Sequence, residues 1–317
     1  MEEAEKKIEE KKDEHKVETK ELKIKKSYSQ LYDEYYRITF VIPILLLLIS
    51  LGYLAVFYHN NGDIIRKDVS LTGGTTVTVF DSKVGLSDLT EKIKVDFPDA
   101  HVQGISDFRT GGQKGFFVET KESADGVKKF LENYLGYKLT QDNSSIEFSG
   151  SALSQGFYKQ LQTAVLIAFV FMAIVVFIIF RTFIPSFAVV LSAFADIIMT
   201  LATANIIGME VSIAGIVAFL MLIGYSVDTD ILLTSRLLKA REGTTNERIF
   251  GAFKTGITMT LTAIAAVGVS LYMVHGLSDT LSQIFIIILI GLGYDILNTW
   301  MTNASILKWY VERKEGK

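Results

Sequence analysis

The sequence is dominated by long, unbroken runs of apolar residues that charged segments separate. A helix needs about 20 mostly apolar residues to cross the hydrocarbon of a membrane. A soluble domain of this size would spread its apolar residues at helical or strand periods instead. The sequence therefore predicts an α-helical membrane protein with six transmembrane helices, at residues 38–58, 161–180, 186–207, 211–235, 257–275 and 281–306.

The basic residues between these spans indicate how the chain is oriented. The turns near Gly208 and Gly276 contain no lysine or arginine, and short loops of this kind are typical of the outer side. Apart from the long stretch 59–160, basic residues occur in four segments, which are the N-terminal tail 1–37, the turn at Arg181, the connection 236–256 and the C-terminal tail 308–317. We therefore expect both termini in the cytoplasm and residues 59–160 on the outer face of the cell membrane.

The polar stretch 59–160 alternates strand and helix patterns. β-branched and apolar runs predict strands at 75–80, 101–108, 115–120 and 145–148. Amphipathic segments predict helices at 87–97 and 123–135, and a turn falls at 110–112. The order β-α-β-β-α-β predicts a ferredoxin-like α+β domain, with two helices packed on one antiparallel sheet. This exterior domain lies between the first and second spans.

Several classes of function find no support in the sequence. The chain has no cysteine, and its 4 histidines are scattered without the spacing of a metal site. The pair Gly73 and Gly74 lacks the lysine and the helix of a phosphate-binding loop. A net charge of −3 is too small to indicate a nucleic-acid partner, and no cleavable signal peptide precedes the first span. We expect no enzyme activity, no cofactor and no metal.

Four carboxylates occur inside predicted spans: Asp196, Asp228, Asp230 and Asp295. A carboxylate at this depth costs several kcal/mol, so it faces a bundle interior or a water path and often carries protons or ions. Helical rise places Asp196, Asp228 and Asp295 about 12–20 Å from the nearest cytoplasmic marker on their helices, at depths where they can meet. The alternative is that each carboxylate only holds a neighbouring helix through hydrogen bonds.

Helical spacing separates the two carboxylates of the fourth span. Residues two apart point to nearly opposite sides, so Asp228 and Asp230 cannot face the same neighbour. Gly224 lies one turn before Asp228 and permits close approach of another helix. We therefore rank Asp228 first as the coupling residue and Asp230 second. Threonines and asparagines share a face of the fifth and sixth spans, where we expect helix–helix hydrogen bonds: Thr258, Thr262, Asn298, Thr299 and Thr302.

Three segments resemble the SecD/SecF family. The segment DVSLTGGT at 68–75 resembles the family signature D-F-T-G-G-T through Asp68, Thr72, Gly73, Gly74 and Thr75. DIIMT at 196–200 resembles its H-D-V-I-x-T segment. GYSVDTDILLTSR at 224–236 resembles G-Y-S-I-N-D-T-V-V-V-F-D-R through Gly224, Tyr225, Ser226 and Arg236. In the bacterial motif the aspartate stands at the position of Thr229, which identifies this chain as similar to the archaeal branch.

This resemblance implies a function in protein export. A chain of this family works with SecD in a pseudo-symmetric bundle of the RND transporter type and associates with the SecYEG channel. It would act on the unfolded polypeptide in transit, with energy from the proton gradient entering through the intramembrane carboxylates. Two other functions stay open, which are an RND-type exporter of small molecules or lipids and a passive scaffold of the translocase.

Overall fold

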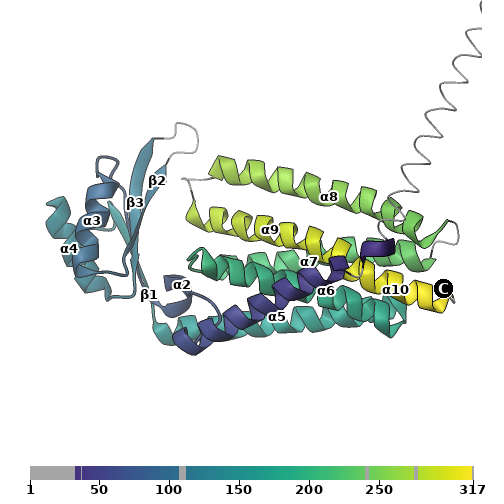
Figure 1. Cartoon of the computed structure of the whole chain (residues 1–317). Coiled ribbons are helices and arrows are strands. Elements are labelled where there is room, and N and C mark those ends of the chain that lie inside the picture. Colours follow the sequence, from purple (N-terminus) through teal and green to yellow (C-terminus); the bar gives the residue numbers. More distant parts are fainter. Residues whose placement is uncertain (1–32, 37, 107–111, 240–242, 275–277, 316–317) are drawn as a thin grey trace, which may run out of the picture.

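The molecule consists of a bundle of long helices and a small sheet domain at one end of the bundle (Figure 1). The computed structural model describes residues 33–36, 38–106, 112–239, 243–274 and 278–315. Within this part, six helices are long and apolar enough to cross a membrane. The charged tail 1–32 lies outside the described residues.

The bundle contains the first span, Asp33–Asn61, followed by five more helical spans. These are α5 (Ser151–Phe180), α6 (Phe183–Ile206), α7 (Ile213–Lys239), α8 (Thr245–Val274) and the continuous series α9 (Asp279–Leu297), η1 (Asn298–Asn303) and α10 (Ala304–Lys314). Several helices extend beyond the apolar runs that predict them. The second span begins at Ser151 rather than near residue 161, because polar residues continue the helix into the sheet domain.

The sheet domain has the expected β-α-β-β-α-β order. Its elements are β1 (Gly74–Val79), α3 (Leu86–Asp96), β2 (His101–Ser106), β3 (Gln113–Thr120), α4 (Ala124–Leu135) and β4 (Ser144–Ser149). The strands form one antiparallel sheet in the order β2-β3-β1-β4. A short helix, α2 (Val69–Thr72), precedes β1 and was not expected from the sequence. The predicted turn 110–112 lies almost entirely outside the described residues.

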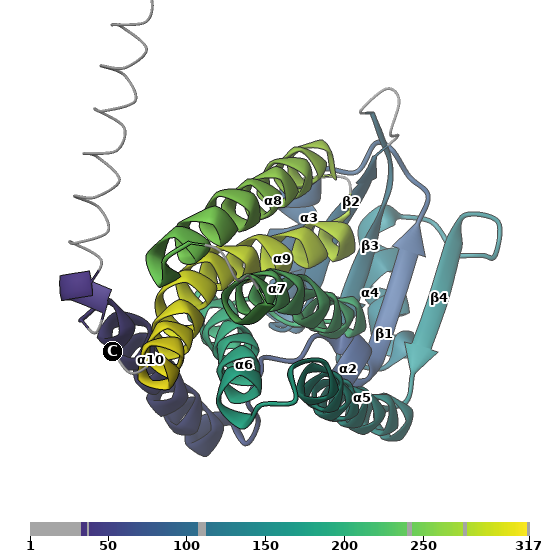
Figure 2. The ribbon, with the colours of Figure 1, turned by 90° about the vertical axis from the view of Figure 1, so that its right-hand side faces the viewer.

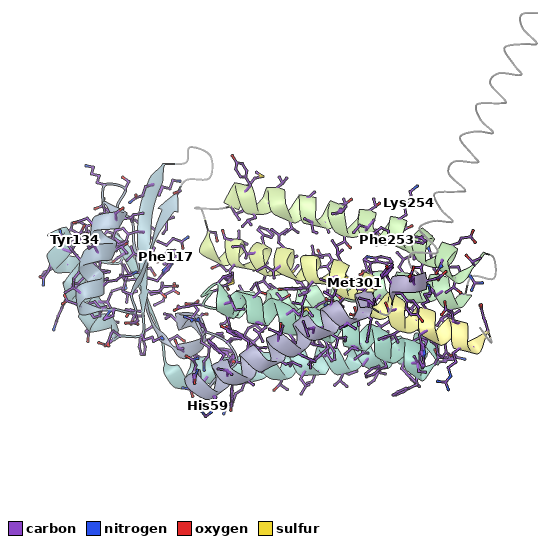
Figure 3. The ribbon with its side chains drawn as sticks, in the orientation of Figure 1. His59, Phe117, Tyr134, Phe253, Lys254 and Met301 are labelled. Atoms are coloured by element: carbon purple, nitrogen blue, oxygen red, sulfur yellow. The ribbon has the colours of Figure 1, made fainter. Side chains whose placement is uncertain are left out.

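Alternation along the strands explains how the sheet domain packs. Two apolar side chains on each of β1 and β3 alternate along the strand and are buried: Val77, Val79, Phe116 and Val118. They meet Leu89 of α3 and Leu131 of α4. Each such buried side chain stabilises the domain by about 1.5–3 kcal/mol. Figure 3 shows Phe117 on the opposite face of the sheet, which is turned toward the helices of the bundle. The sheet therefore separates its own core from the bundle.

Helix α7 occupies the middle of the bundle (Figure 2). It contacts α5, α6, α8 and α9, and its buried apolar residues pack against α5 and α6 on one side and against α8 and α10 on the other. The first span packs along α6, where Leu47 contacts Ala195 and Met199. Much of α8 is left uncovered by the rest of the described chain. The helices α6, α7 and α9 thus form the centre of the bundle.

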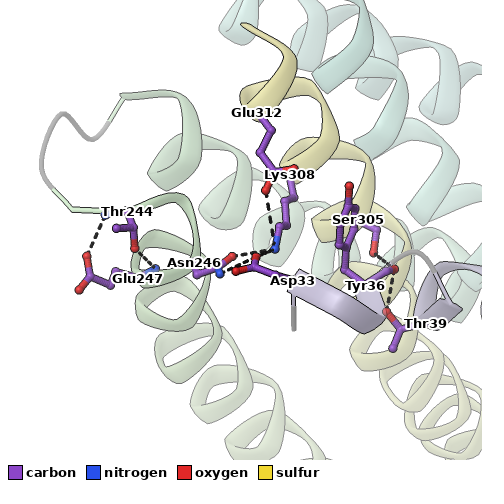
Figure 4. A network of polar contacts seen from close by, with 9 residues as sticks. All are labelled: Asp33, Tyr36, Thr39, Thr244, Asn246, Glu247, Ser305, Lys308 and Glu312. Carbon is purple, nitrogen blue, oxygen red and sulfur yellow. Dashed lines mark hydrogen bonds and ion pairs between the residues drawn. The ribbon is translucent and has the colours of Figure 1, made fainter. Parts of the chain in front are cut away.

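A buried lysine joins three elements at the end of the bundle away from the sheet domain (Figure 4). Lys308 of α10 is fully buried and forms an ion pair with Asp33, at the start of the first span. Its ammonium also donates to Asn246 of α8 at 2.9 Å and lies 4.6 Å from the ring centroid of Tyr36. Lys308 was expected at the start of a charged tail, but α10 continues past it and places it in the interior.

Candidate functional site

Three carboxylates from three different helices lie buried in the centre of the bundle. Asp196 of α6 and Asp230 of α7 are fully buried, and Asp295 of α9 is 1% exposed. Hydroxyl and amide groups connect these three residues, which we call the carboxylate cluster. The prediction that deep carboxylates from separate spans meet is therefore confirmed for Asp196 and Asp295, with Asp230 as the third member.

Asp196 binds the two neighbouring helices through its two oxygens. The hydroxyl of Ser226 on α7 donates to Oδ2, and the amide of Asn298 in η1 donates to Oδ1 at 2.7 Å. Helical spacing aligns Ser226 with Asp230, one turn further along α7. The α6 carboxylate is thus fixed by donors from both of the other helices of the cluster.

Asp230 and Asp295 share a donor. The hydroxyl of Thr299 lies 2.9 Å from Oδ1 of Asp230 and 3.1 Å from Oδ1 of Asp295. The amide of Asn303 donates to Oδ1 of Asp230 at 2.7 Å, and the hydroxyl of Thr229 lies 3.0 Å and 3.1 Å from the two oxygens of Asp295. Because one hydroxyl proton can satisfy only one acceptor at a time, the state of one carboxyl group affects the other.

A π-helical segment in the sixth span positions several of these donors. Segment η1 runs from Asn298 to Asn303, directly after Asp295 on α9. In an α-helix, two residues five apart point about 140° away from each other. The wider turn of a π-helix brings them back toward one face, and such turns are frequent at functional sites. This geometry lets both Asn298 and Asn303 reach the carboxylate cluster.

Asn303 and Thr229 were missed as site residues at the level of sequence. At the α-helical period Asn303 lies about 80° from Asp295 and about 140° from Asn298, at the edge of their shared face. No residue pattern announces the π-helical turn that brings Asn303 to the cluster. Thr229 is buried and donates to Asp295 although it stands where the bacterial motif has an aspartate. That replacement was the one available signal for Thr229.

No cation neutralises the cluster within the described part of the chain. Asp196, Asp230 and Asp295 form no ion pair with any lysine or arginine there, in contrast to Asp33 and Lys308. Oδ2 of Asp230 and the hydroxyl of Ser192 have no hydrogen-bond partner among the described residues. Among the described residues, no three histidine, aspartate or glutamate side chains are placed so that together they could hold a metal ion. Neutral hydroxyls and amides are therefore the groups that hold these carboxylates.

Asp228, ranked first at the level of sequence, lies outside the cluster. Its side chain is exposed on α7, whereas Asp230 takes the buried side. The two residues point in opposite directions, as expected, and Asp230, ranked second as the coupling residue, is the one that contacts the other carboxylates. A Cβ on Gly224 would meet nothing within 4 Å, so none of the helices that the structure describes approaches there.

The exposed side of α7 forms a continuous stripe. Val217, Met221, Gly224, Tyr225 and Asp228 recur at helical spacing, and all are exposed. We call these five residues the α7 stripe. It places a carboxylate on a helix that is otherwise central to the bundle. A monomer in lipid would leave this charge facing hydrocarbon.

The hydroxyl-bearing faces of the fifth and sixth spans differ in their bonding. Asn298 and Thr299 bond other helices, as expected. Thr258 and Thr262 donate instead to carbonyls of their own helix, those of Lys254 and Thr258, and both are exposed. The expectation of helix–helix bonds was wrong for these two threonines, because no other described helix covers α8 on that side.

The family motif at 68–75 has a structural role at the base of the sheet domain. Asp68 caps α2 by accepting from the amide of Val69 at 2.5 Å. Gly73 adopts φ 84°, which favours glycine, and a Cβ on Gly74 would collide with the carbonyl of Thr120. Thr75 donates to the carbonyl of Glu122 at 2.7 Å. The motif therefore turns the chain sharply from α2 into β1.

The family segment 224–236 is bound at its last residue. Arg236, at the end of α7, donates to the carbonyl of Gly251 at 3.0 Å and to the hydroxyl of Thr255 at 3.1 Å. Both acceptors belong to α8. Arg236 therefore ties α7 to α8 about 9 Å along the helix from Asp230.

Fold and site together define a multi-span membrane protein with buried carboxylates between its spans and a small α+β domain between the first two. The model of the family "Protein export membrane protein SecD/SecF, C-terminal" matches residues 129–313. The protein-export membrane protein SecF of Methanolacinia petrolearia is 40% identical over 87% of this chain and 94% of its own length. SecF of Methanocaldococcus jannaschii is 36% identical over 89% of this chain and 98% of its own. The chain belongs to the SecD/SecF family of protein-export membrane proteins, as a relative of archaeal SecF.

A solved structure shares the fold. The crystal structure of SecDF from Thermus thermophilus, a translocon-associated membrane protein, aligns with a TM-score of 0.66 at 17% identity. The alignment covers 87% of this chain and 38% of the SecDF chain. The present chain thus corresponds in architecture to less than half of that longer protein.

Proposed function

We propose that this chain acts together with SecD as an accessory subunit of the Sec translocase, and that protons moving through the carboxylate cluster supply energy for export. The observation that carries the proposal is the meeting of Asp196, Asp230 and Asp295 in the interior of the bundle without a basic partner among the described residues. The family gives the export role, and the relatives are named for it.

The cluster has the properties of a site that exchanges protons. Each ionised carboxylate at this depth costs about 2.5–3.5 kcal/mol, and nearby like charges add repulsion. Protons are the available counter-charge where no cation is present. The shared hydroxyl of Thr299 gives the carboxyl groups of Asp230 and Asp295 a means to sense each other. Arrival or loss of a proton would change how α6, α7 and α9 are held together.

The α7 stripe supports a partner within the membrane. Charged residues inside membrane spans face protein or water rather than lipid, and a glycine permits close helix approach. The part of the chain that the structure describes leaves Asp228 and Gly224 uncovered. The bundle of SecD, with a similar six-span plan, would cover the stripe. In this arrangement Asp228 faces the contact between the two bundles, while Asp230 serves the interior.

The proposed orientation places the sheet domain outside the cell membrane and both termini in the cytoplasm. Arg181, Arg236, Lys239, Arg248 and Arg313 all lie at the ends of helices away from the sheet domain. Basic residues in short connections are typical of the cytoplasmic side. The chain has no cysteine of its own, so Ser145→Cys would be the one site for a thiol reagent that cannot cross the membrane. We expect this cysteine to react in intact cells. A reaction only after the cells are lysed would show that the sheet domain faces the cytoplasm.

Proton coupling is tested by neutralising the carboxylate cluster. Membrane vesicles containing the chain, SecD and the SecYEG channel would be assayed for export with and without a proton gradient. We expect Asp196→Asn, Asp230→Asn and Asp295→Asn to reduce the gradient-dependent export to that of vesicles without this chain. Asparagine keeps the size of the side chain but cannot carry the proton.

Two measurements complete this test. Glu210→Gln, outside the cluster, should retain the gradient response and serves as the matched control. Co-purification with SecD should persist in all four variants, because none of the altered residues belongs to the α7 stripe. A gradient response at wild-type level in the three asparagine variants would contradict proton coupling through the carboxylate cluster. No gradient response with the unaltered chain would leave the passive scaffold as the function.

A further inference from the structure

We propose that residues 64–70 form a rigid joint with the ends of α6, α7 and α9, and that Asn205 and Gln283 are the residues that position it. The joint would pass movement of these helices to the sheet domain. This inference rests on the proposed function, because it names the path from the carboxylate cluster to the domain. It is carried by a continuous set of hydrogen bonds at the sheet-domain end of the bundle.

The backbone of the segment pairs with the turn between α6 and α7. The amide of Val211 donates to the carbonyl of Arg66 at 2.7 Å, and the amide of Asp68 donates back to the carbonyl of Val211 at 3.1 Å. Lys67 and Val211 thereby form a parallel β-bridge. Paired backbone groups of this kind fix both position and direction. The root of the sheet domain is therefore joined to the turn between two helices of the cluster.

Asn205 fixes the same segment to the end of α6. This side chain is fully buried. Its amide donates to the carbonyl of Ile64 at 2.7 Å, and its carbonyl oxygen accepts from the amide of Arg66 at 3.3 Å. Asn205 is nine residues after Asp196 on the same helix, which is about 14 Å along its axis. A shift of α6 at the cluster is thus carried directly to residues 64–66.

Gln283 adds the third helix. Its carbonyl oxygen accepts from the backbone amide of Ser212 at 3.0 Å and from the hydroxyl of Ser212 at 2.5 Å, and its amide donates to the carbonyl of Glu210 at 2.5 Å. The residue lies on α9, the helix of Asp295. At the start of α7, the amide of Ile213 donates to the hydroxyl of Ser70 in α2 at 3.2 Å. All three helices of the carboxylate cluster are therefore attached to one joint.

A fourth attachment steadies the joint from the side. Asp63 forms an ion pair with Lys67 at 2.8 Å and accepts from the hydroxyl of Tyr158 on α5 at 2.6 Å. Partial burial raises the pKa of Asp63, but the ion pair and the hydrogen bonds lower it more, so the pKa lies below its usual value. The chain enters the sheet domain at this point and leaves it through α5. Both connections of the domain are thus held together, which favours a joint that moves as a unit.

The absence of cysteine allows the joint to be broken and restored in one protein. Asn205→Ala and Gln283→Ala would be compared with Thr203→Val, a control on the same turn of α6 that removes the bond between Thr203 and Tyr294. Hydrogen–deuterium exchange of residues 64–70, measured in the complete complex, reports how firmly these residues are held. We expect exchange to rise about tenfold in the two alanine variants, as the loss of roughly one hydrogen bond predicts, and to stay unchanged in the control.

Gradient-dependent export measures whether movement of the helices reaches the sheet domain through the joint. We expect both alanine variants to lose the gradient-dependent part of export while they still co-purify with SecD. A disulfide between Lys67→Cys and Val211→Cys, whose residues are bridge partners, should restore the response to Asn205→Ala when oxidised and not when reduced. In the chain that is otherwise unchanged, export should be the same with the two cysteines oxidised as with them reduced, because a rigid joint does not open.

Three results would overturn this inference. These are unchanged exchange in the alanine variants, raised exchange with an undiminished gradient response, and a block of export by the disulfide in the otherwise unchanged chain. Failure of the proposed function has a different signature, since the unaltered chain would then show no gradient response at all. The exchange measurement tests the attachment in either case.

Discussion

At the scale of single residues, hydrogen bonding and burial separate side chains that look alike in the sequence. Asp228 and Asp230 are two positions apart on one span, yet one is exposed and the other is held by Thr299 and Asn303. The sequence predicts that they diverge, because the helical period alone determines this. It does not show which one turns inward, since that depends on where α6 and α9 lie.

The ion pair of Lys308 and Asp33 gives a prediction at the same scale. Lys308 is fully buried and the side chain of Asp33 is 52% exposed. Asp33→Ala leaves a buried ammonium without its main partner, which costs about 3 kcal/mol or more. Lys308→Met removes the buried charge and leaves a carboxylate that water can reach, so we expect a cost of about 1 kcal/mol. Thermal unfolding in detergent should therefore show the larger loss for Asp33→Ala.

A second carboxylate near Lys308 and an exposed ion pair elsewhere set the scale for comparing the two variants. Glu312 lies 3.8 Å from the ammonium and only partly replaces Asp33. Lys92→Met, which breaks an exposed pair with Asp88, serves as the control and should leave the unfolding temperature nearly unchanged. An equal or greater loss for Lys308→Met than for Asp33→Ala would contradict the stated role of burial.

At the scale of elements, most of the fold follows from the sequence. The apolar runs give all six spans, and the alternating strands and amphipathic helices give the sheet domain in its correct order. The exact ends of the helices do not follow, because polar residues such as those at the start of α5 continue a helix without an apolar signal. The π-helical segment also has no signal, since it arises where α9 packs against its neighbours.

The contact between α8 and η1 gives a prediction for these elements. A Cβ on Gly256 of α8 would collide with the indole of Trp300 in η1, whereas a Cβ on Gly268 of the same helix would meet nothing within 4 Å. We expect Gly256→Ala to destabilise the protein by about 1–3 kcal/mol through overpacking. Gly268→Ala should be neutral or slightly stabilising, because alanine is the better helix former. Thermal unfolding of the two variants compares them directly; equal stability would contradict the close packing of α8 on η1.

At the scale of the whole molecule, the sequence predicts that buried carboxylates form the candidate site, but it does not predict which residues belong to that site. Intramembrane carboxylates are costly and therefore few, so the sequence reduces the search to four residues. Asp196, Asp230 and Asp295 meet, and the donors between them come from helices distant in sequence. Asn303 and Thr229 belong to the site through packing, which single-sequence patterns do not encode.

The α7 stripe gives the prediction for the assembled molecule. Gly224→Leu adds a side chain to a surface that the described residues leave open, so the chain itself should fold as before. If SecD covers the stripe, the added bulk should prevent close approach and reduce co-purification with SecD. Gly52→Leu, on an open face of the first span, should leave co-purification intact. Undiminished co-purification of Gly224→Leu would place the partner on another face.

The π-helical segment has a further consequence for comparing this chain with its relatives. A π turn accommodates more residues than the α turn that it replaces, so it is equivalent to an insertion inside a membrane span. An alignment that permits no gap in the sixth span would therefore shift every later position by one in any relative that lacks the turn. In such a relative, the counterparts of Asn303 and Lys308 would be assigned to the wrong columns, and their apparent variability would reflect helix geometry rather than loss of the side chains.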